Sequence, residues 1–161
     1  MTQKVFILLC FCFQIQQIKA QRAHVIYAEA LGSSMIYSLN YDMRFGQQHN
    51  GLGFRIGFSR LSRNGSSNNI PLQINYLLGQ KQHLLEVGLG VLRLQQQDGA
   101  GAKSQFTFPN ATLMYRFQPL EKGISFRIGW TPIYIRSSQT NAYDFSKLFW
   151  AWGGLSVGYR F

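Results

Sequence analysis

The sequence predicts an all-β protein, a closed antiparallel up-and-down β-barrel of eight strands. Apolar and polar residues alternate with a period of two over most of the chain, which is typical of strands whose two faces meet different environments. The 161 residues include 16 Gly and 15% aromatic residues, but only 14% are charged. This composition does not suit a helical domain, whose exposed faces need many Lys and Glu. The length allows one domain of ordinary size.

Residues 1–20 are expected to be a cleaved signal peptide. A basic residue precedes an apolar run at residues 5–13, which has the length of a signal-peptide core. An anchor helix is the alternative, but this run is too short to cross a bilayer, which needs about 20 residues. The polar stretch that follows ends at Ala20, so cleavage is expected before Gln21. Residues 21–161 then form the barrel domain.

No set of residues in the sequence is a candidate for holding a cofactor. Both cysteines, Cys10 and Cys12, lie in the segment that is expected to be removed. Thiolate metal sites, thiol nucleophiles and disulfides are therefore not expected in the mature chain. The three histidines, His24, His49 and His83, lack the close spacing of a histidine metal site. We expect neither a metal nor another cofactor.

The alternation defines eight expected strands. In residues 51–60, Leu52 and Ile56 share one face while Gly53 and Arg55 share the other. An even number is favoured because both chain ends of a membrane barrel then lie on the same side. Merging the first two strands into one long strand would give seven. The expected strands are 24–31, 35–45, 51–60, 70–78, 83–93, 111–117, 124–134 and 154–161.

The segments between the strands alternate in length. Three are short: 46–50, 79–82 and 118–123. Three are longer and rich in Ser, Asn, Gln and Gly: 61–69, 95–105 and 137–147. Bacterial outer-membrane barrels show this asymmetry between periplasmic turns and extracellular loops. The first hairpin, at residues 32–34, is the exception because it is short where a long loop is expected.

The composition of the two faces favours a transmembrane barrel over a soluble, ligand-holding barrel. The polar face holds mainly Arg and Gly, and Lys, the common residue of soluble barrel surfaces, is scarce. We therefore expect the apolar face to meet lipid and the polar face to fill the interior. An aromatic-rich sandwich core is the alternative. The aromatic residues expected at the two membrane interfaces are Tyr37, Tyr41, Phe58, Tyr76, Tyr115, Trp130, Tyr134 and Tyr159.

An inward polar face would place several charges inside the barrel. A buried charge without a partner is costly, so these residues are expected to form a paired, hydrogen-bonded network. We interpret it as a structural plug of the lumen. A catalytic carboxylate or a proton path is the alternative. The residues of this expected network are Glu29, Asp42, Arg44, Arg55, Glu86, Arg116, Arg127 and Arg160.

The end of the sequence carries a resemblance. Leu155, Val157, Tyr159 and Phe161 alternate in the manner of the C-terminal assembly signal of outer-membrane barrels. Residues 27–45 are similar to the opening of small outer-membrane barrel proteins of the Bacteroidota. The resemblance covers essentially the whole mature chain, and the expected architecture is similar to OmpX-like and OmpA-type barrels. It implies an outer-membrane location and insertion by the barrel-assembly machinery, but it brings no catalytic motif.

The function that this sequence predicts is that of a non-enzymatic outer-membrane protein with an envelope-structural or surface-interaction role. Outer-membrane lipid and lipopolysaccharide are the expected partners, the loop partner is open, and a monomer is expected. The net charge of +10 does not indicate a nucleic-acid partner, because the arginines are spread over the strands. A narrow channel or carrier for small hydrophobic molecules is the alternative. A lipid A-modifying enzyme is a weaker one, because no His-x-Ser motif occurs.

Overall fold

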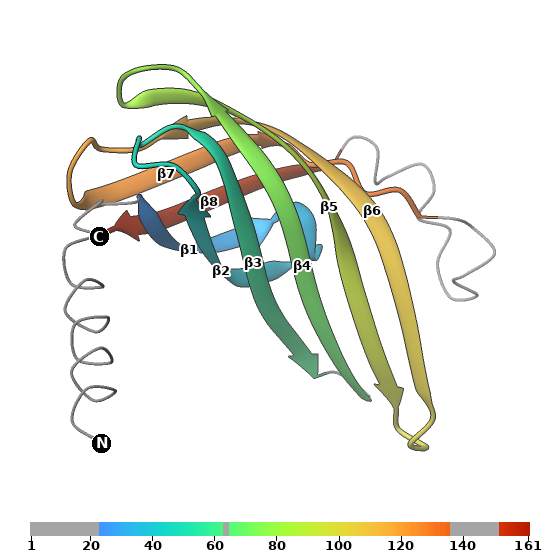
Figure 1. Cartoon of the computed structure of the whole chain (residues 1–161). Coiled ribbons are helices and arrows are strands. Elements are labelled where there is room, and N and C mark those ends of the chain that lie inside the picture. The colour runs from blue at the N-terminus through green and yellow to red at the C-terminus, as the bar shows by residue number, and fades with distance from the viewer. Residues whose placement is uncertain (1–22, 63–64, 136–151) are drawn as a thin grey trace, which may run out of the picture.

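A computed structural model describes residues 23–62, 65–135 and 152–161. They form a closed barrel in which each strand pairs antiparallel with the next and β8 pairs with β1 (Figure 1). The expected signal peptide, with its cleavage site at Ala20 and Gln21, lies outside the described residues. The strands are β1 (His24–Leu31), β2 (Tyr37–Arg44), β3 (Gly51–Ser62), β4 (Gly65–Leu78), β5 (His83–Asp98), β6 (Lys103–Phe117), β7 (Gly123–Trp130) and β8 (Gly153–Arg160).

The number of strands and the short first hairpin are as the alternation predicts. The chain reverses between β1 and β2 through a single 3-10 turn, η1 (Gly32–Ser34). Leu31 and Met35, which flank this turn, both adopt positive φ, at 61° and 76°. The Leu31 N–H donates to the Ile36 carbonyl at 2.6 Å, which closes the hairpin. The merged seven-strand alternative is therefore wrong.

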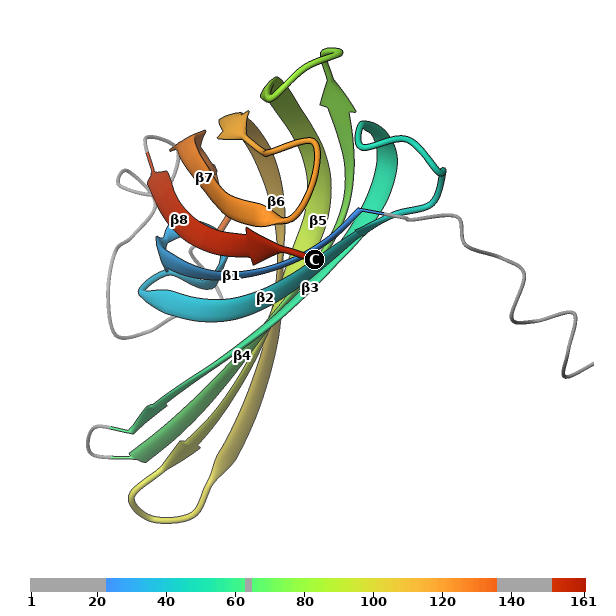
Figure 2. The ribbon, with the colours of Figure 1, turned by 90° about the vertical axis from the view of Figure 1, so that its left-hand side faces the viewer.

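Two of the three expected long loops are wrong. Residues 61–69 lie mostly in β3 and β4, and residues 95–105 lie mostly in β5 and β6. Their polar side chains alternate between two faces as before, and the backbone ladder extends through them, as in the pairs Leu61↔Ser67 and Gln95↔Gln105. As a result β3 to β6 project well beyond the other four strands (Figure 2). The third expected loop, 137–147, lies outside the described residues.

The expected strand 124–134 ends early. β7 stops at Trp130, and Pro132, which has no N–H to donate, follows. The chain remains beside β6 through one bridge, Asn110↔Ile133, and through a bond from the Tyr134 N–H to the Pro109 carbonyl at 2.9 Å. Among the described residues, no helix has the length and apolar character to cross a membrane.

Every strand carries large apolar side chains on its outward face, although the projecting ends of β3 to β6 are polar outside. The interior is mostly polar. Leu89 is 72% exposed and Ile124 is 69% exposed, whereas Arg44, Arg55 and Arg116 are completely buried. The aromatic residues assigned to the apolar face all point outward and are exposed or half-buried. One apolar cluster lies inside, farther from the chain ends than the charges. It consists of Leu92, Leu94, Phe108, Ile133 and Ile135.

Candidate functional site

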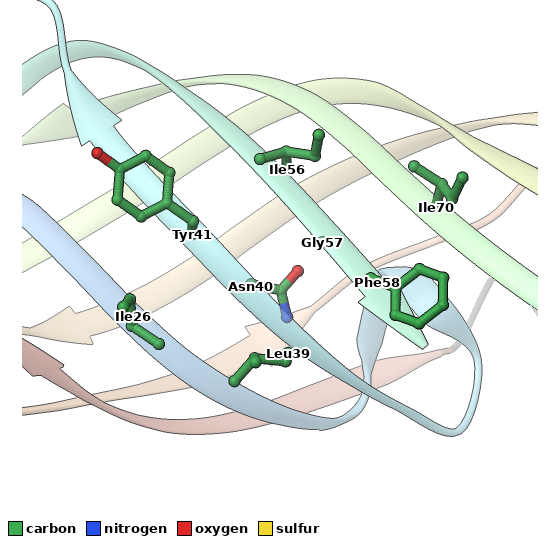
Figure 3. Close-up of a pocket in the computed structure, with 8 residues that line it drawn as sticks. All are labelled: Ile26, Leu39, Asn40, Tyr41, Ile56, Gly57, Phe58 and Ile70. Atoms are coloured by element: carbon green, nitrogen blue, oxygen red, sulfur yellow. The ribbon is translucent and has the colours of Figure 1, made fainter. Parts of the chain in front are cut away.

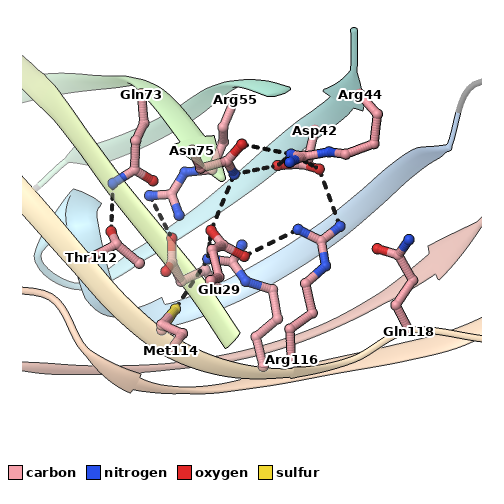
Figure 4. Close-up of polar contacts among 12 residues, drawn as sticks. Glu29, Asp42, Arg44, Arg55, Gln73, Asn75, Thr112, Met114, Arg116 and Gln118 are labelled. Carbon is pink, nitrogen blue, oxygen red and sulfur yellow. Dashed lines mark hydrogen bonds and ion pairs between the residues drawn. The ribbon is translucent and has the colours of Figure 1, made fainter. Parts of the chain in front are cut away.

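The interior charges gather around two carboxylates, of which Asp42 on β2 is the first. Arg44 Nη2 donates to both Asp42 oxygens, at 2.6 and 2.7 Å, and also to Asn75 Oδ1 at 2.6 Å. Arg116, from β6 on the far wall, reaches Asp42 Oδ1 at 3.1 Å. Asn75 Nδ2 donates to Asp42 Oδ2 at 2.7 Å. Asp42 thus ties β4 and β6 to β2 across the lumen (Figure 4).

Glu86 on β5 is the second carboxylate. It accepts from Arg116 Nη1 at 3.1 Å, from Arg127 Nη2 at 3.0 Å and from Asn75 Nδ2 at 3.1 Å. Arg116 therefore bridges both carboxylates, and Asn75 does so from β4. The Arg127 guanidinium also lies over the Tyr27 ring at 4.3 Å from its centroid, a cation–π contact. Every charged member of this group is buried, so the pairs must offset a large loss of hydration.

The other half of the interior is less tightly bonded. Arg55 Nη2 lies 3.6 Å from Glu29 Oε2, which is an ion pair without a hydrogen bond. All three Arg55 guanidinium nitrogens and both Glu29 oxygens are buried without a hydrogen-bond partner. The two halves together contain four buried arginines and three buried acids, with Arg160 not counted.

Arg160, the eighth member of the expected network, lies apart from it. Its guanidinium donates to the Pro119 carbonyl at the rim that carries the chain ends, and no ion pair with a carboxylate is found for it among the described residues. The reason is its position as the last residue of β8, beyond the level of the acids. The expected assembly residues Leu155, Val157, Tyr159 and Phe161 all face outward.

Asn75 is the main interior residue that sequence reasoning did not assign to the network. Its position on the polar face of β4 was visible in the alternation, but an uncharged amide gives no sign that it bridges two carboxylates. Gln73, two residues earlier, donates to Thr112 on β6 in a similar way. Both amides form hydrogen bonds with side chains of other strands. These contacts depend on how the closed barrel brings its walls together.

Glycines make room for the large interior side chains. A Cβ on Gly53 would lie 2.2 Å from Arg44 Cζ, and one on Gly158 would lie 2.4 Å from Tyr27 Cβ. Both distances are shorter than any real contact. The lumen is therefore filled by long side chains that lie over glycines, as expected for an eight-stranded barrel.

The described residues do not assemble a recognisable catalytic group. His24 and His83 lie on the outer face, where their Nδ1 atoms are 2.6 Å from the hydroxyls of Tyr41 and Tyr115. No hydrogen bond or ion pair joins a described histidine to a serine or a carboxylate. No group of three His, Cys, Asp or Glu suited to a metal occurs among these residues. The interior arrangement is chemically able to brace the wall and to block the lumen.

An apolar groove of about 370 Å³ lies on the outside of the barrel. It runs over β1 to β4 between Ile26, Leu39, Tyr41, Phe58 and Ile70 (Figure 3). The β3–β4 ladder is interrupted beside it, because Pro71 stands opposite Gly57 and has no N–H to donate. The groove is therefore mainly a feature of the outward apolar surface, and the buried Asn40 and Gly57 complete its lining.

Comparison with known proteins does not identify a family for this chain. No protein-family model matches it, and neither the curated proteins nor the solved structures provide a significant match. The resemblance to outer-membrane barrels of the Bacteroidota therefore stays a prediction, while the closed eight-stranded antiparallel barrel is shown.

Proposed function

We propose that this protein is a non-enzymatic integral protein of the bacterial outer membrane, with an envelope-structural or surface-interaction role. The inverted distribution of polarity carries the proposal. All eight strands expose large apolar side chains on the outside, while the inside holds ion pairs and buried amides. Membrane barrels alternate apolar-out and polar-in in this way.

The transfer free energies of the outward side chains favour hydrocarbon over water around the barrel. Moving a Leu, Ile or Phe side chain out of water contributes about 1.5–3 kcal/mol. A surface in water would forgo this contribution at positions such as Leu39, Leu89 and Ile124, all more than half exposed. Monomeric soluble proteins rarely expose contiguous apolar patches larger than a few hundred Å². A lipid environment removes this conflict without any change in the fold.

The filled interior favours a structural role over the channel alternative. Arg116 and Arg127 extend across the lumen toward acids on other strands, and Arg44 pairs with Asp42 on its own strand. The apolar cluster around Phe108 lies beyond them. Conductance across a planar bilayer tests this choice: single-channel steps from the purified protein would favour the channel. Outer-membrane lipid, lipopolysaccharide and the barrel-assembly machinery are the partners that the proposal implies.

The membrane placement is tested by two substitutions on one face of one strand. Leu89 and Gln95 both point outward from β5, but only Leu89 lies within the apolar zone. In a bilayer, Leu89→Arg should cost about 2–4 kcal/mol of folding free energy, because a charge then enters the hydrocarbon. Gln95→Arg, the matched control, should change stability by about 0.5 kcal/mol or less. Urea-induced unfolding from phospholipid vesicles measures both.

A barrel whose outer surface meets water should respond differently to these two substitutions. Leu89 is 72% exposed, so a barrel that folds in water should tolerate arginine at both positions equally. Equal unfolding midpoints for the two variants would contradict the membrane proposal.

A further inference from the structure

The projecting part of β3 to β6 has an outer face made of amides, hydroxyls and cations. Cross-strand pairing aligns these side chains in two rows, one behind the other. The first row is Arg60, Asn68, Gln95 and Gln105, and the second is Ser62, Ser66, Gln97 and Lys103. None of these side chains is acidic. We call this surface the amide face.

The amide face contains a shallow hollow of about 230 Å³ over β4, β5 and β6. Asn68 Oδ1 is buried beside it without a hydrogen-bond partner. Arg93, just below the first row, donates from Nη2 to Gln105 Oε1 at 3.2 Å. The acid closest in sequence, Asp98, is engaged at the turn, where it accepts from the Ala100 and Ala102 N–H groups. The hollow therefore offers both donors and acceptors, and within the described residues no carboxylate forms an ion pair with Arg60, Arg93 or Lys103.

The apolar groove lies immediately below this face. Phe58 and Ile70 line the end of the groove that is nearest the amide face. Phe58 precedes Arg60 by two residues on the outer face of β3. Ile70 follows Asn68 by two residues on the outer face of β4. An elongated apolar chain in the groove would thus end beneath Arg60. The groove and the amide face form one continuous surface that changes from apolar to polar.

The heights of these groups fit a leaflet boundary. A strand rises about 3.3 Å per residue and tilts by about 40° in such a barrel, so each residue adds about 2.5 Å along the axis. Arg93 then lies about 10 Å above Leu89, and Gln95 and Gln97 lie about 15 and 20 Å above it. The apolar band of these barrels is about 25 Å tall. With Leu89 near its middle, Arg93 reaches the band edge and the amides stand outside it.

We propose that this surface binds an acidic glycolipid of the surrounding leaflet. The groove takes an acyl chain, Arg60 and Arg93 bind its phosphate or carboxylate groups, and the amide rows bind the sugar hydroxyls. Guanidinium groups suit phosphate because they offer two parallel donors. Amides suit sugars because each one both donates and accepts. The inference rests on the proposed membrane placement, since only a bilayer brings the acyl chain to the groove.

The test compares two double variants that lose the same charge at opposite ends of the barrel. Arg60→Gln with Arg93→Gln alters the proposed site, and Lys81→Gln with Lys122→Gln alters exposed turns at the chain-end rim. The probe is purified lipopolysaccharide, titrated onto the folded protein in neutral detergent micelles. The first pair should lower the affinity about tenfold or more, because charge-assisted hydrogen bonds are the strong ones. The second pair should leave it within about twofold, because it lies at the far rim.

Two further probes divide the site into its parts. Phosphatidylglycerol, which has a charge and acyl chains but no sugar, should bind more weakly than lipopolysaccharide. The delipidated core oligosaccharide, which lacks acyl chains, should also bind more weakly. Asn68→Ala with Gln95→Ala should reduce the preference for lipopolysaccharide over phosphatidylglycerol and leave phosphatidylglycerol binding unchanged.

Several results would overturn the inference. Equal losses of affinity in the two double variants would mean that lipopolysaccharide is attracted non-specifically. If phosphatidylglycerol bound as tightly as lipopolysaccharide, the amide rows would have no part in binding. If the free oligosaccharide bound as tightly, the groove would have none. The failure of the membrane proposal is recognised separately, because Leu89→Arg and Gln95→Arg report on it without any glycolipid present.

Discussion

Glu86 is held by side chains from three other strands: Asn75, Arg116 and Arg127. Its carboxylate is completely buried, as are both arginines. The described interior already has one more arginine than acids when Arg160 is left out. Removing the charge of Glu86 therefore leaves two guanidinium groups in a space that water reaches poorly, and breaking a buried pair on one side is the costly case.

Glu86→Gln should destabilise the barrel by about 3–5 kcal/mol, since the amide keeps the shape but loses the charge. Glu121→Gln is the matched control, because Glu121 is exposed in the turn between β6 and β7 and should change stability by about 0.5 kcal/mol or less. Urea midpoints in detergent micelles compare the two. Equal midpoints would mean that the interior pairs contribute nothing net.

Strand alternation was predictable because the side-chain period of two is a property of the extended backbone. It placed Arg55, Glu86 and Arg127 on the inner wall before any pairing was known. It failed at residues 61–69 and 95–105, where both faces of the sheet carry polar side chains and the contrast that reveals a strand is absent. The partners inside the lumen could not be predicted, because the stagger of a closed barrel decides which strands face each other.

Strand β5 offers a test that compares side-chain packing inside the barrel with packing on its outer surface. Leu92 is completely buried in the apolar cluster, and Leu89, three residues earlier on β5, points outward. Leu92→Ala should cost about 2–5 kcal/mol, because it loses transfer energy and leaves a cavity that neighbours fill only partly. Leu89→Ala should cost less, because detergent or lipid chains occupy the space. Urea unfolding in micelles measures both, and a larger loss for Leu89→Ala would contradict a packed inner cluster.

The closure of the barrel is a property of the whole molecule. β1 and β8 join through seven residue pairs, from Val25↔Arg160 to Leu31↔Gly154, so the eight-strand ring has no unpaired edge below the projecting region. Opening such a ring requires many backbone hydrogen bonds to break together.

We therefore expect heat-modifiable migration on SDS gels. The unboiled protein should keep its folded ring and run differently from the boiled, unfolded chain. A variant with Val157→Pro provides the control, because Val157 pairs with Ala28 on β1 and with Phe126 on β7, and proline removes a donor from the ladder. It should lose the unboiled band. Identical migration of the boiled and unboiled native protein would contradict a closed, SDS-resistant ring.

The unequal strands have a consequence for the membrane around the protein. β1, β2, β7 and β8 have eight residues each, whereas β3 to β6 have 12 to 16. Eight residues at the usual rise and tilt span about 20 Å along the axis, which is less than a band of about 25 Å. In the proposed placement, lipid beside β8 and β1 must thin, while lipid beside β4 and β5 need not. The molecule then has a preferred lateral direction, and proteins with equally short walls gather on its thin side, where the mismatch is shared.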